Sequence, residues 1–148
     1  MSDHTLRQFS GYSMKRAFAA VQADVSAALA PFGLRMLSFS ALVLIVDNPR
    51  RRQSQLADAL AIERPNLVIV VDELERAGLI TRERTAADKR AYALEATAAG
   101  RRLYDETVRV VQQHEARMTQ GLDASEHAIL RQALRSIELA GKGAPKDG

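Results

Sequence analysis

The chain contains no cysteine among its 148 residues. This absence excludes disulfide bonds, thiol-based redox sensing and cysteine-ligated zinc within the chain. Long apolar runs are also missing, because no uninterrupted stretch approaches the roughly 20 residues that a membrane-spanning helix needs. The polar segment Met1 to Arg7 lacks the hydrophobic region of a signal peptide. We therefore expect a soluble, cytoplasmic protein with no membrane partner.

The signatures of common enzyme and metal sites are absent as well. The sequence has no nucleophile elbow, phosphate-binding glycine loop or paired-glycine dinucleotide fingerprint. The histidines are scattered at His4, His114 and His127. His114-Glu115 begins like a zinc-protease motif, but Met118 stands where the second histidine would be. We expect no catalytic residues, no cofactor and no metal site.

The charge of the chain is small but rich in arginine. Formal net charge is only +3, yet 17 of the 21 basic residues are arginine. The guanidinium group suits bidentate contacts to phosphate and guanine, and it also enters narrow minor grooves. Because arginine also forms ordinary surface ion pairs, the placement of these charges must decide their role.

Hydrophobic spacing predicts a mainly helical fold. Apolar residues at intervals of three and four predict an amphipathic helix from Leu6 to Ala30, ended by Pro31 and Gly33. The segment Met36 to Val46 is apolar almost all round, so we expect it at the centre of the core, with a break at Asp47–Pro49. Further helices are predicted over residues 53–60, 63–77, 98–119 and 125–139.

One segment is ambiguous between helix and strand. The β-branched residues of Leu67 to Val71 also suit a buried strand. Pro65 in a first turn and the uninterrupted pattern through Arg76 favour a helix, which Gly78 would end. The preceding helix and this one would form a helix-turn-helix.

A β-hairpin is predicted after this helix. Ile80 to Thr85 and Ala91 to Ala96 are the expected strands, and Ala86 to Arg90 is the loop between them. Thr97 can cap the helix that follows. Such an arrangement suits duplex DNA, because a helix fits the major groove and a hairpin tip can reach the next groove.

The expected architecture is mainly α with a small β-hairpin wing. The terminal helices are too apolar to remain single in water, so residues 1–34 and 98–141 are expected to form one dimerisation unit. A winged helix-turn-helix, residues 35–97, would be inserted between the N- and C-terminal dimerisation helices. Residues 142–148 are expected to form a flexible tail.

Several segments resemble the MarR family of bacterial transcriptional regulators. They are Gln53–Leu60 before the recognition helix, Leu74–Ile80 at its end, and the wing Asp88-Lys89-Arg90, where the family usually has Asp-Arg-Arg. Leu94–Gly100 also matches the family's leucine, threonine and glycine spacing. The resemblance covers essentially the whole chain. It implies a homodimer on a palindromic DNA site and a small-molecule effector that usually weakens DNA binding.

The first turn of the predicted recognition helix contains Arg64, Pro65 and Asn66. This turn is the part of such a helix that meets base edges, where Arg suits guanine and Asn suits adenine. Alternatively, Asn66 merely faces solvent. Val68 could touch a thymine methyl group if it faces the groove, and core packing is the alternative.

The wing tip offers Arg90 for the minor groove, with Asp88 to orient its guanidinium and Lys89 beside it. A narrow A·T groove concentrates negative potential and attracts arginine. The alternative is an ordinary exposed ion pair worth about 0.5 kcal/mol.

Arg50, Arg51 and Arg52 depart from the family's pattern, because Arg52 stands just before Gln53, where the family usually has a serine or threonine helix cap. Cations at a helix N-terminus oppose the helix dipole at a cost of roughly a few tenths of a kcal/mol each, and a phosphate there would reverse that cost. We expect this run to bind the DNA backbone together with Ser54 and Gln55. The alternatives are that the arginines meet the phosphates of an anionic effector and that Ser54 is a local cap.

Five residues are predicted to face the family's usual effector cavity: Tyr12, Arg16, Phe18, Met36 and Phe39. Each could instead belong to the core. The family's common ligands suggest an aromatic acid or its acyl-CoA thioester. The sequence therefore predicts a homodimeric repressor that a small-molecule effector releases from a pseudo-palindromic operator in double-stranded DNA. The alternative is a helical protein-interaction adaptor that does not bind DNA.

Overall fold

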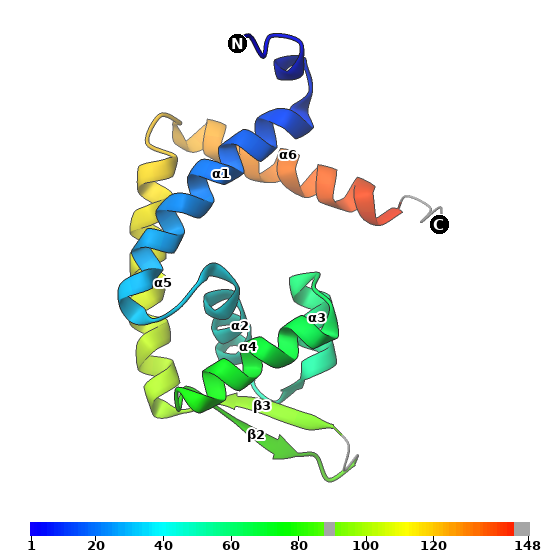
Figure 1. Ribbon diagram of the computed structural model, residues 1–148, viewed down its shortest axis with the longest axis vertical. Helices are drawn as coiled ribbons and strands as arrows, with labels where there is room; N and C mark the ends of the chain where they lie inside the picture. Colours follow the sequence, from blue (N-terminus) through cyan, green and yellow to red (C-terminus); the bar gives the residue numbers. More distant parts are fainter. Residues whose placement is uncertain (88–90, 144–148) are drawn as a thin grey trace. The chain divides into compact units, whose positions relative to one another are not determined.

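The computed structural model describes residues 1–87 and 91–143 and divides the chain into two compact units, Met1–His114 and Glu115–Gly148. Figure 1 shows the order of the elements along the chain. The helices are α1 (Ser10–Leu29), α2 (Met36–Asp47), α3 (Gln53–Leu60), α4 (Arg64–Arg76), α5 (Ala98–Met118) and α6 (Ala124–Gly143), with 3-10 turns η1 (Leu6–Gln8) and η2 (Ala30–Phe32). The strands are β1 (Arg51–Arg52), β2 (Ile80–Arg84) and β3 (Tyr92–Ala96).

The core of the first unit is centred on α2, as predicted from its apolar sequence. Ala41, Leu42 and Ile45 are at most 1% exposed. Helix α2 contacts α1, α3, α4 and strand β3, so it supports the whole helix-turn-helix. Before α2, Gly33 ends the 3-10 turn that follows α1. Its φ of +69° is a left-handed conformation that glycine adopts without strain.

A tight turn joins α3 to α4. Ala61 adopts a left-handed conformation with φ +52°, and its N–H donates to the Asp58 carbonyl at 3.2 Å. Ile62 N–H donates to the Ala57 carbonyl at 3.1 Å, which satisfies the end of α3. These hydrogen bonds fix the angle between α3 and α4.

Helix α4 confirms the helical interpretation of the ambiguous segment. Leu67, Val70, Val71 and Leu74 are all at most 2% exposed and lie on one side of the helix. The β-branched residues therefore pack as a helical stripe against the core. Burial of this stripe outweighs their weak helix propensity, which costs at most about 0.7 kcal/mol per residue.

The wing is part of a three-stranded antiparallel sheet of order β1-β3-β2. Strands β2 and β3 pair from Ile80 opposite Ala96 to Arg84 opposite Tyr92, as the predicted hairpin requires. Strand β1, which the sequence did not predict, adds a third strand beside β3. A strand of two residues is too short to show the alternation of polar and apolar residues that marks a strand, so only its pairing with β3 defines β1.

The start of α5 is attached to the end of α4. Gly100 N–H donates to Thr97 Oγ1 at 3.0 Å, so Thr97 caps α5 as predicted. The same hydroxyl donates to the Gly78 carbonyl at 2.7 Å, and Thr97 N–H donates to the Leu79 carbonyl at 3.0 Å. One residue therefore joins the cap of α5 to the turn between α4 and β2.

The second unit contains α6, which begins with a reciprocal capping box. Glu126 N–H donates to Asp123 Oδ1 at 2.8 Å, and Asp123 N–H donates to Glu126 Oε2 at 2.9 Å. The helix continues to Gly143, beyond its predicted end at residue 139 and into the predicted tail. An ion pair of 2.6 Å between Lys142 Nζ and Glu138 Oε1 supports this last turn. Residues 144–148 of the predicted tail lie outside the described part.

No single helix among the described residues is long and apolar enough to cross a membrane, although Ser10–Phe32 and Met36–Asp47 together meet such a criterion as a pair bent by 69°.

Candidate nucleic-acid interface

The first turn of α4 presents the residues that the sequence predicts for base contacts. Arg64, Pro65 and Asn66 are all exposed at the N-terminus of the helix. Proline suits this turn because the first amides of a helix have no partner within the helix. Asn66 N–H donates to the Glu63 carbonyl at 3.0 Å, so the turn is hydrogen-bonded at its start. The three residues therefore lie in the exposed first turn of α4, and their contact with DNA stays a prediction.

The middle of α4 carries two exposed apolar residues. Val68 is 42% exposed and Ile69 is 55% exposed. Val68 is therefore not a core residue, although the sequence left that alternative open. The exposure of Ile69 was not predicted. The signal for it was the helical period, because the buried residues Leu67, Val70 and Val71 leave residue 69 on the opposite side.

The carboxylates in the second half of α4 are all paired with arginine. Arg82 of β2 pairs with Asp72 and lies with its Nε 3.4 Å from Glu75 Oε2. Arg35 holds Glu73 through contacts of 3.1 and 3.2 Å to its two oxygens. These pairs reduce the negative potential that α4 would otherwise offer to a phosphate backbone.

The three arginines before α3 have different surroundings. Arg50 Nη1 lies 3.1 Å from Glu83 Oε2 and 3.6 Å from Glu95 Oε2, so this side chain holds the two wing strands together. Arg52 immediately precedes α3, and its N–H donates to the Gln55 side-chain oxygen at 3.0 Å. Gln55, and not Ser54, therefore caps this helix.

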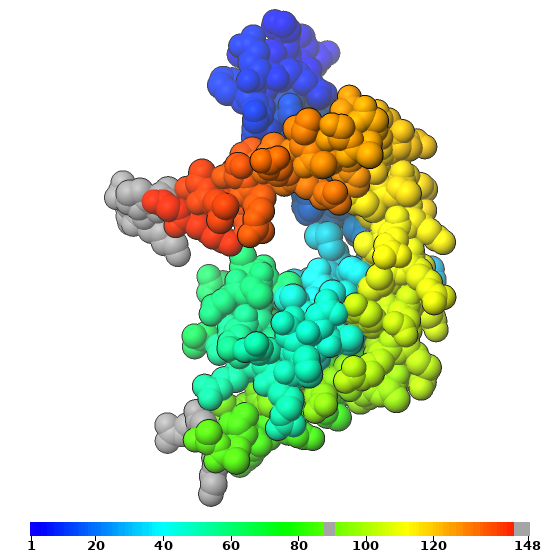
Figure 2. Space-filling model, turned by 180° about the vertical axis from the view of Figure 1, so that it is seen from behind, coloured from blue at the N-terminus to red at the C-terminus, as the bar shows by residue number. Residues whose placement is uncertain are grey.

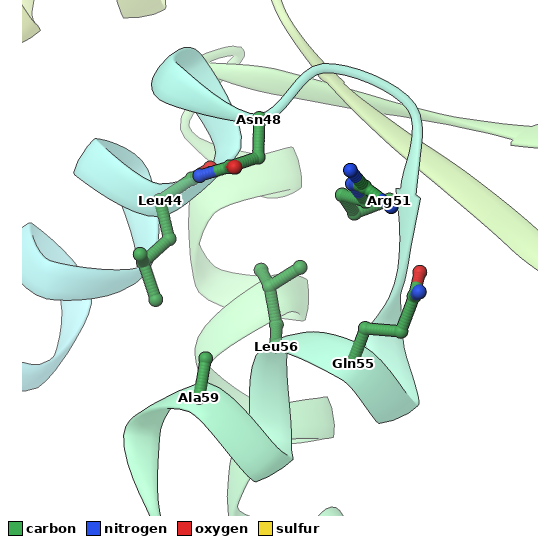
Figure 3. Close-up of a pocket in the computed structure, with 6 residues that line it drawn as sticks. All are labelled: Leu44, Asn48, Arg51, Gln55, Leu56 and Ala59. Atoms are coloured by element: carbon green, nitrogen blue, oxygen red, sulfur yellow. The ribbon is translucent and has the colours of Figure 1, made fainter.

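Arg51 lies at the side of a cavity of about 280 Å³, and no carboxylate of residues 1–87 or 91–143 pairs with it. Figure 3 shows Leu56 rising between the apolar side of the cavity and the polar side. The lining residues are Leu44, Leu56, Ala59, Asn48, Arg51 and Gln55. The cavity therefore combines an apolar wall with the Arg51 cation, a combination that suits an amphipathic anion.

The predicted wing contacts Asp88, Lys89 and Arg90 lie outside the described residues. The strands that carry the wing are well paired up to that point, with Thr85 N–H donating to the Ala91 carbonyl at 3.1 Å. The Arg84 guanidinium lies 5.8 Å from the centre of the Tyr92 ring, a cation–π contact across the two strands.

Among residues 1–87 and 91–143, no group of three or more histidine, aspartate or glutamate side chains is arranged to hold a metal ion. Instead, two histidines contact single carboxylates. His114 of α5 is almost fully buried, and its Nδ1 lies 2.5 Å from Oδ2 of Asp24 in α1. His127 Nε2 lies 2.9 Å from Glu115 Oε1.

Comparison with known proteins gives a consistent family. Residues 32–91 match the model of the MarR family. The transcriptional repressor CouR, bound to a 23-mer DNA duplex, is 34% identical over 93% of this chain and 98% of its own, with a TM-score of 0.89. The chain belongs to the MarR family. Its resemblance to that family and its winged-helix fold are therefore confirmed.

Other MarR-family structures contain small molecules. CouR from Rhodococcus jostii RHA1 bound to p-coumaroyl-CoA is 33% identical over 86% of this chain and 90% of its own, with a TM-score of 0.78. A Mycobacterium tuberculosis MarR-family protein in complex with salicylic acid is 28% identical over 87% of this chain and 96% of its own, with a TM-score of 0.70. These relatives are transcriptional regulators, and the chain is grouped with them and not with enzymes.

Of the effector positions predicted on α1 of this MarR-family chain, Arg16 and Phe18 lie on its surface and Tyr12 is half-buried. Phe18 is 49% exposed, and Arg16 is also exposed. Tyr12 donates a 2.8 Å hydrogen bond to Asp3 Oδ2, which lowers the pKa of Asp3 and raises the pKa of Tyr12. Arg7 covers the same ring at 5.6 Å.

The two predicted effector positions on α2, Met36 and Phe39, are half-buried and pack against the core of the first unit. None of the five predicted positions lines the cavity at Arg51 or a smaller one of about 160 Å³ next to Glu73. Their role in binding an effector therefore stays a prediction.

Proposed function

We propose that this chain is a DNA-binding transcriptional repressor that acts in the cytoplasm as a homodimer on a pseudo-palindromic operator and is released by a small-molecule effector. The observation that carries the proposal is the exposed first turn of α4. Four buried side chains fix α4 on the core, so Arg64 and Asn66 are held on a rigid scaffold where a groove could receive them. The similarity to DNA-bound CouR supports the same use.

The residues of β1 and the start of α3 support binding to the DNA backbone. Arg51, Arg52 and Gln55 are exposed around the start of α3, at the position expected for phosphate contacts. Arg50 is held by two glutamates, so its part in the interface is to fix the wing strands next to the predicted contacts at residues 88–90. Ser54 stays a candidate backbone contact.

The homodimer is supported by the exposed apolar stripe of α6. This helix has no buried residue along its length, and its orange-to-red surface is visible in Figure 2. Ile129, Leu130, Leu134 and Ile137 are each 41% to 62% exposed and follow helical spacing. Such a stripe is costly in water and is typical of a helix that packs against a second subunit. We assign dimerisation to residues 1–34 and 98–141, and DNA binding to residues 35–97.

The effector proposal rests on the solved relatives and on the cavity at Arg51. CouR was solved with an acyl-CoA thioester and the mycobacterial relative with an aromatic acid. Both ligands combine a planar apolar group with an anion, and the cavity combines Leu44 and Leu56 with the Arg51 guanidinium. If Arg51 binds the anion of the effector, it can no longer neutralise a DNA phosphate, so effector and DNA would compete for one cation.

The experiment is a binding assay with the full chain and the intergenic DNA next to its gene, at two salt concentrations. We expect affinity to fall steeply with salt, and Arg64→Ala to weaken operator binding by roughly 5- to 150-fold for each half-site, the range for one bidentate base contact. Arg109→Ala removes one exposed cation from α5 and serves as the matched control. Salt-independent or absent DNA binding would instead support the adaptor alternative.

Two variants decide the role of Arg51. Arg51→Ala should lower the slope of log affinity against log salt by about 1 for each half-site if the residue contacts DNA phosphate. Ala59→Leu narrows the cavity without removing charge, so it should reduce the response to p-coumaroyl-CoA or salicylate and leave DNA affinity unchanged. An unchanged salt slope in Arg51→Ala, together with a lost effector response, would assign Arg51 to the effector alone.

A further inference from the structure

The outward side of α4 carries a small apolar patch within a polar surface. Val68 and Ile69 are 42% and 55% exposed, while their neighbours Leu67 and Val70 are 1% and 0% exposed. The two residues are consecutive and lie beside the exposed ring of Pro65, so they form one patch and not two scattered positions. Helix packing does not need them, because the opposite side of α4 already fills the core.

The patch continues the side of the helix that we assign to DNA. Val68 lies one turn after Arg64, and Ile69 lies one turn after Pro65, since residues four apart are neighbours on a helix. One turn advances about 5.4 Å, which spans between one and two base-pair steps of about 3.4 Å. A helix that places Arg64 at one base edge would therefore bring Val68 and Ile69 to adjacent base pairs.

The charges around the patch favour DNA as the occupant over an apolar protein surface. Asp72 follows on the same side of the helix, and Arg82 pairs with it. Arg64 and Arg76 flank the patch along α4. A patch bordered by arginine, with its nearest carboxylate paired, complements the phosphates on either side of a groove.

The major groove offers one apolar group to such a patch, the C5-methyl group of thymine. The other base edges present hydrogen-bond donors and acceptors, which would lose water without gaining a partner against valine or isoleucine. The same two side chains would thus favour thymine and disfavour the other bases.

We propose that Val68 and Ile69 read thymine methyl groups, one or two base pairs from the base that Arg64 contacts in each half-site. The proposal rests on the proposed function and adds two residues that determine sequence specificity. The partner of the patch is duplex DNA.

The test removes the methyl groups and changes nothing else in the DNA. Operator sequences are first selected with the full chain from a random DNA pool, and each thymine is then replaced by deoxyuridine. Burying one methyl group corresponds to about a fourfold change in affinity. We expect one or two positions in each half-site at which this replacement weakens binding about fourfold, and about 16-fold when both half-sites are changed.

The variants Val68→Ala and Ile69→Ala complete the test. Each should bind its thymine and deoxyuridine operators equally well, because the side chain that detects the methyl group is gone. Both positions are exposed, so the thermal unfolding of the variants should match that of the parent protein. Deoxyuridine at thymines elsewhere in the operator serves as the control and should have no effect.

The possible failures are distinguishable. If the parent protein tolerates deoxyuridine at every position while Arg64→Ala still loses operator binding, the methyl proposal is wrong and the proposed function stands. If both alanine variants keep full DNA affinity and lose binding to another protein, the patch is a protein contact and the methyl proposal is equally wrong. If no sequence is selected from the pool, both proposals fail.

Discussion

Gly100 is the position where a single added methyl group should damage the structure most clearly. A Cβ atom at this residue would lie 2.0 Å from the Leu79 carbonyl oxygen and 3.0 Å from its carbon. The obstacle is backbone, so no side-chain rotation can relieve it. The same carbonyl accepts a hydrogen bond from Thr97, which caps α5. Gly100→Ala must therefore separate the start of α5 from the turn between α4 and β2.

The expected cost follows from these contacts. The oxygen and the new Cβ must move apart by at least about 1 Å to reach a tolerable distance, and such overpacking costs about 1–3 kcal/mol. The bonds from Thr97 to the carbonyls of Leu79 and Gly78 would be strained or lost, at about 1 kcal/mol each. We expect the free energy of unfolding to fall by about 3–5 kcal/mol, a large part of the roughly 5–15 kcal/mol that stabilises a domain.

Urea denaturation followed by circular dichroism, at one protein concentration, measures this loss. Gly11→Ala is the matched control, because Gly11 also lies in the first turn of a long helix and a Cβ there meets nothing within 4 Å. The control should be neutral or slightly more stable, since alanine is the better helix former. Equal stability of the two variants would refute the close approach at Gly100.

Three further predictions concern other contacts. Asp47→Asn should bring the pKa of Tyr104 back toward its ordinary value, because the 2.9 Å hydrogen bond to Asp47 raises it. Ultraviolet absorbance titration measures this pKa. Since the pKa is raised in the folded state, the bond stabilises the fold below about pH 10 and loses that effect as the pH rises through the raised value. Arg82→Ala should weaken operator binding about tenfold at low salt, by exposing the Asp72 carboxylate to DNA, and Asp72→Asn in that background should restore it in the same binding assay. Leu74→Ala should lower the free energy of unfolding by about 2–5 kcal/mol in urea denaturation, because this side chain is 2% exposed in the core.

The helical part of the fold was predictable because apolar spacing records which side of each helix is buried. Helix α4 is the clearest case, since Pro65 and the spacing of Leu67, Val70, Val71 and Leu74 outweighed the strand propensity of the same segment. The Thr97 cap was predictable for a similar reason, because a threonine before a helix has a local hydrogen bond to make.

Features that depend on distant partners were not predictable. Strand β1 exists only because Arg51 and Arg52 pair with β3, a segment about 40 residues away in sequence. The glutamates that hold Arg50 also come from β2 and β3, so three adjacent arginines with one local pattern have three different surroundings. The end of α6 was placed too early because Gly141 and Gly143 are poor helix formers, whereas the ion pair to Lys142 extends the helix.

The candidate site was predictable where position along a helix decides exposure, as for Arg64 and Asn66. Ile69 received no role from the sequence, although its helical position places it on the outside of α4. The effector positions were the least predictable. A cavity is lined by residues from several helices and strands, and the sequence pattern does not show how those elements are arranged in space.

Hydroxyl-radical footprinting of the operator complex, combined with its mass by sedimentation, tests the central claim most directly. The claim is that two copies of the chain place their α4 helices in successive major grooves of one duplex. We expect two chains per duplex and two protected half-sites whose centres are about 10 base pairs apart. A complex with one chain and one protected patch, or a duplex with no protection at all, would contradict it.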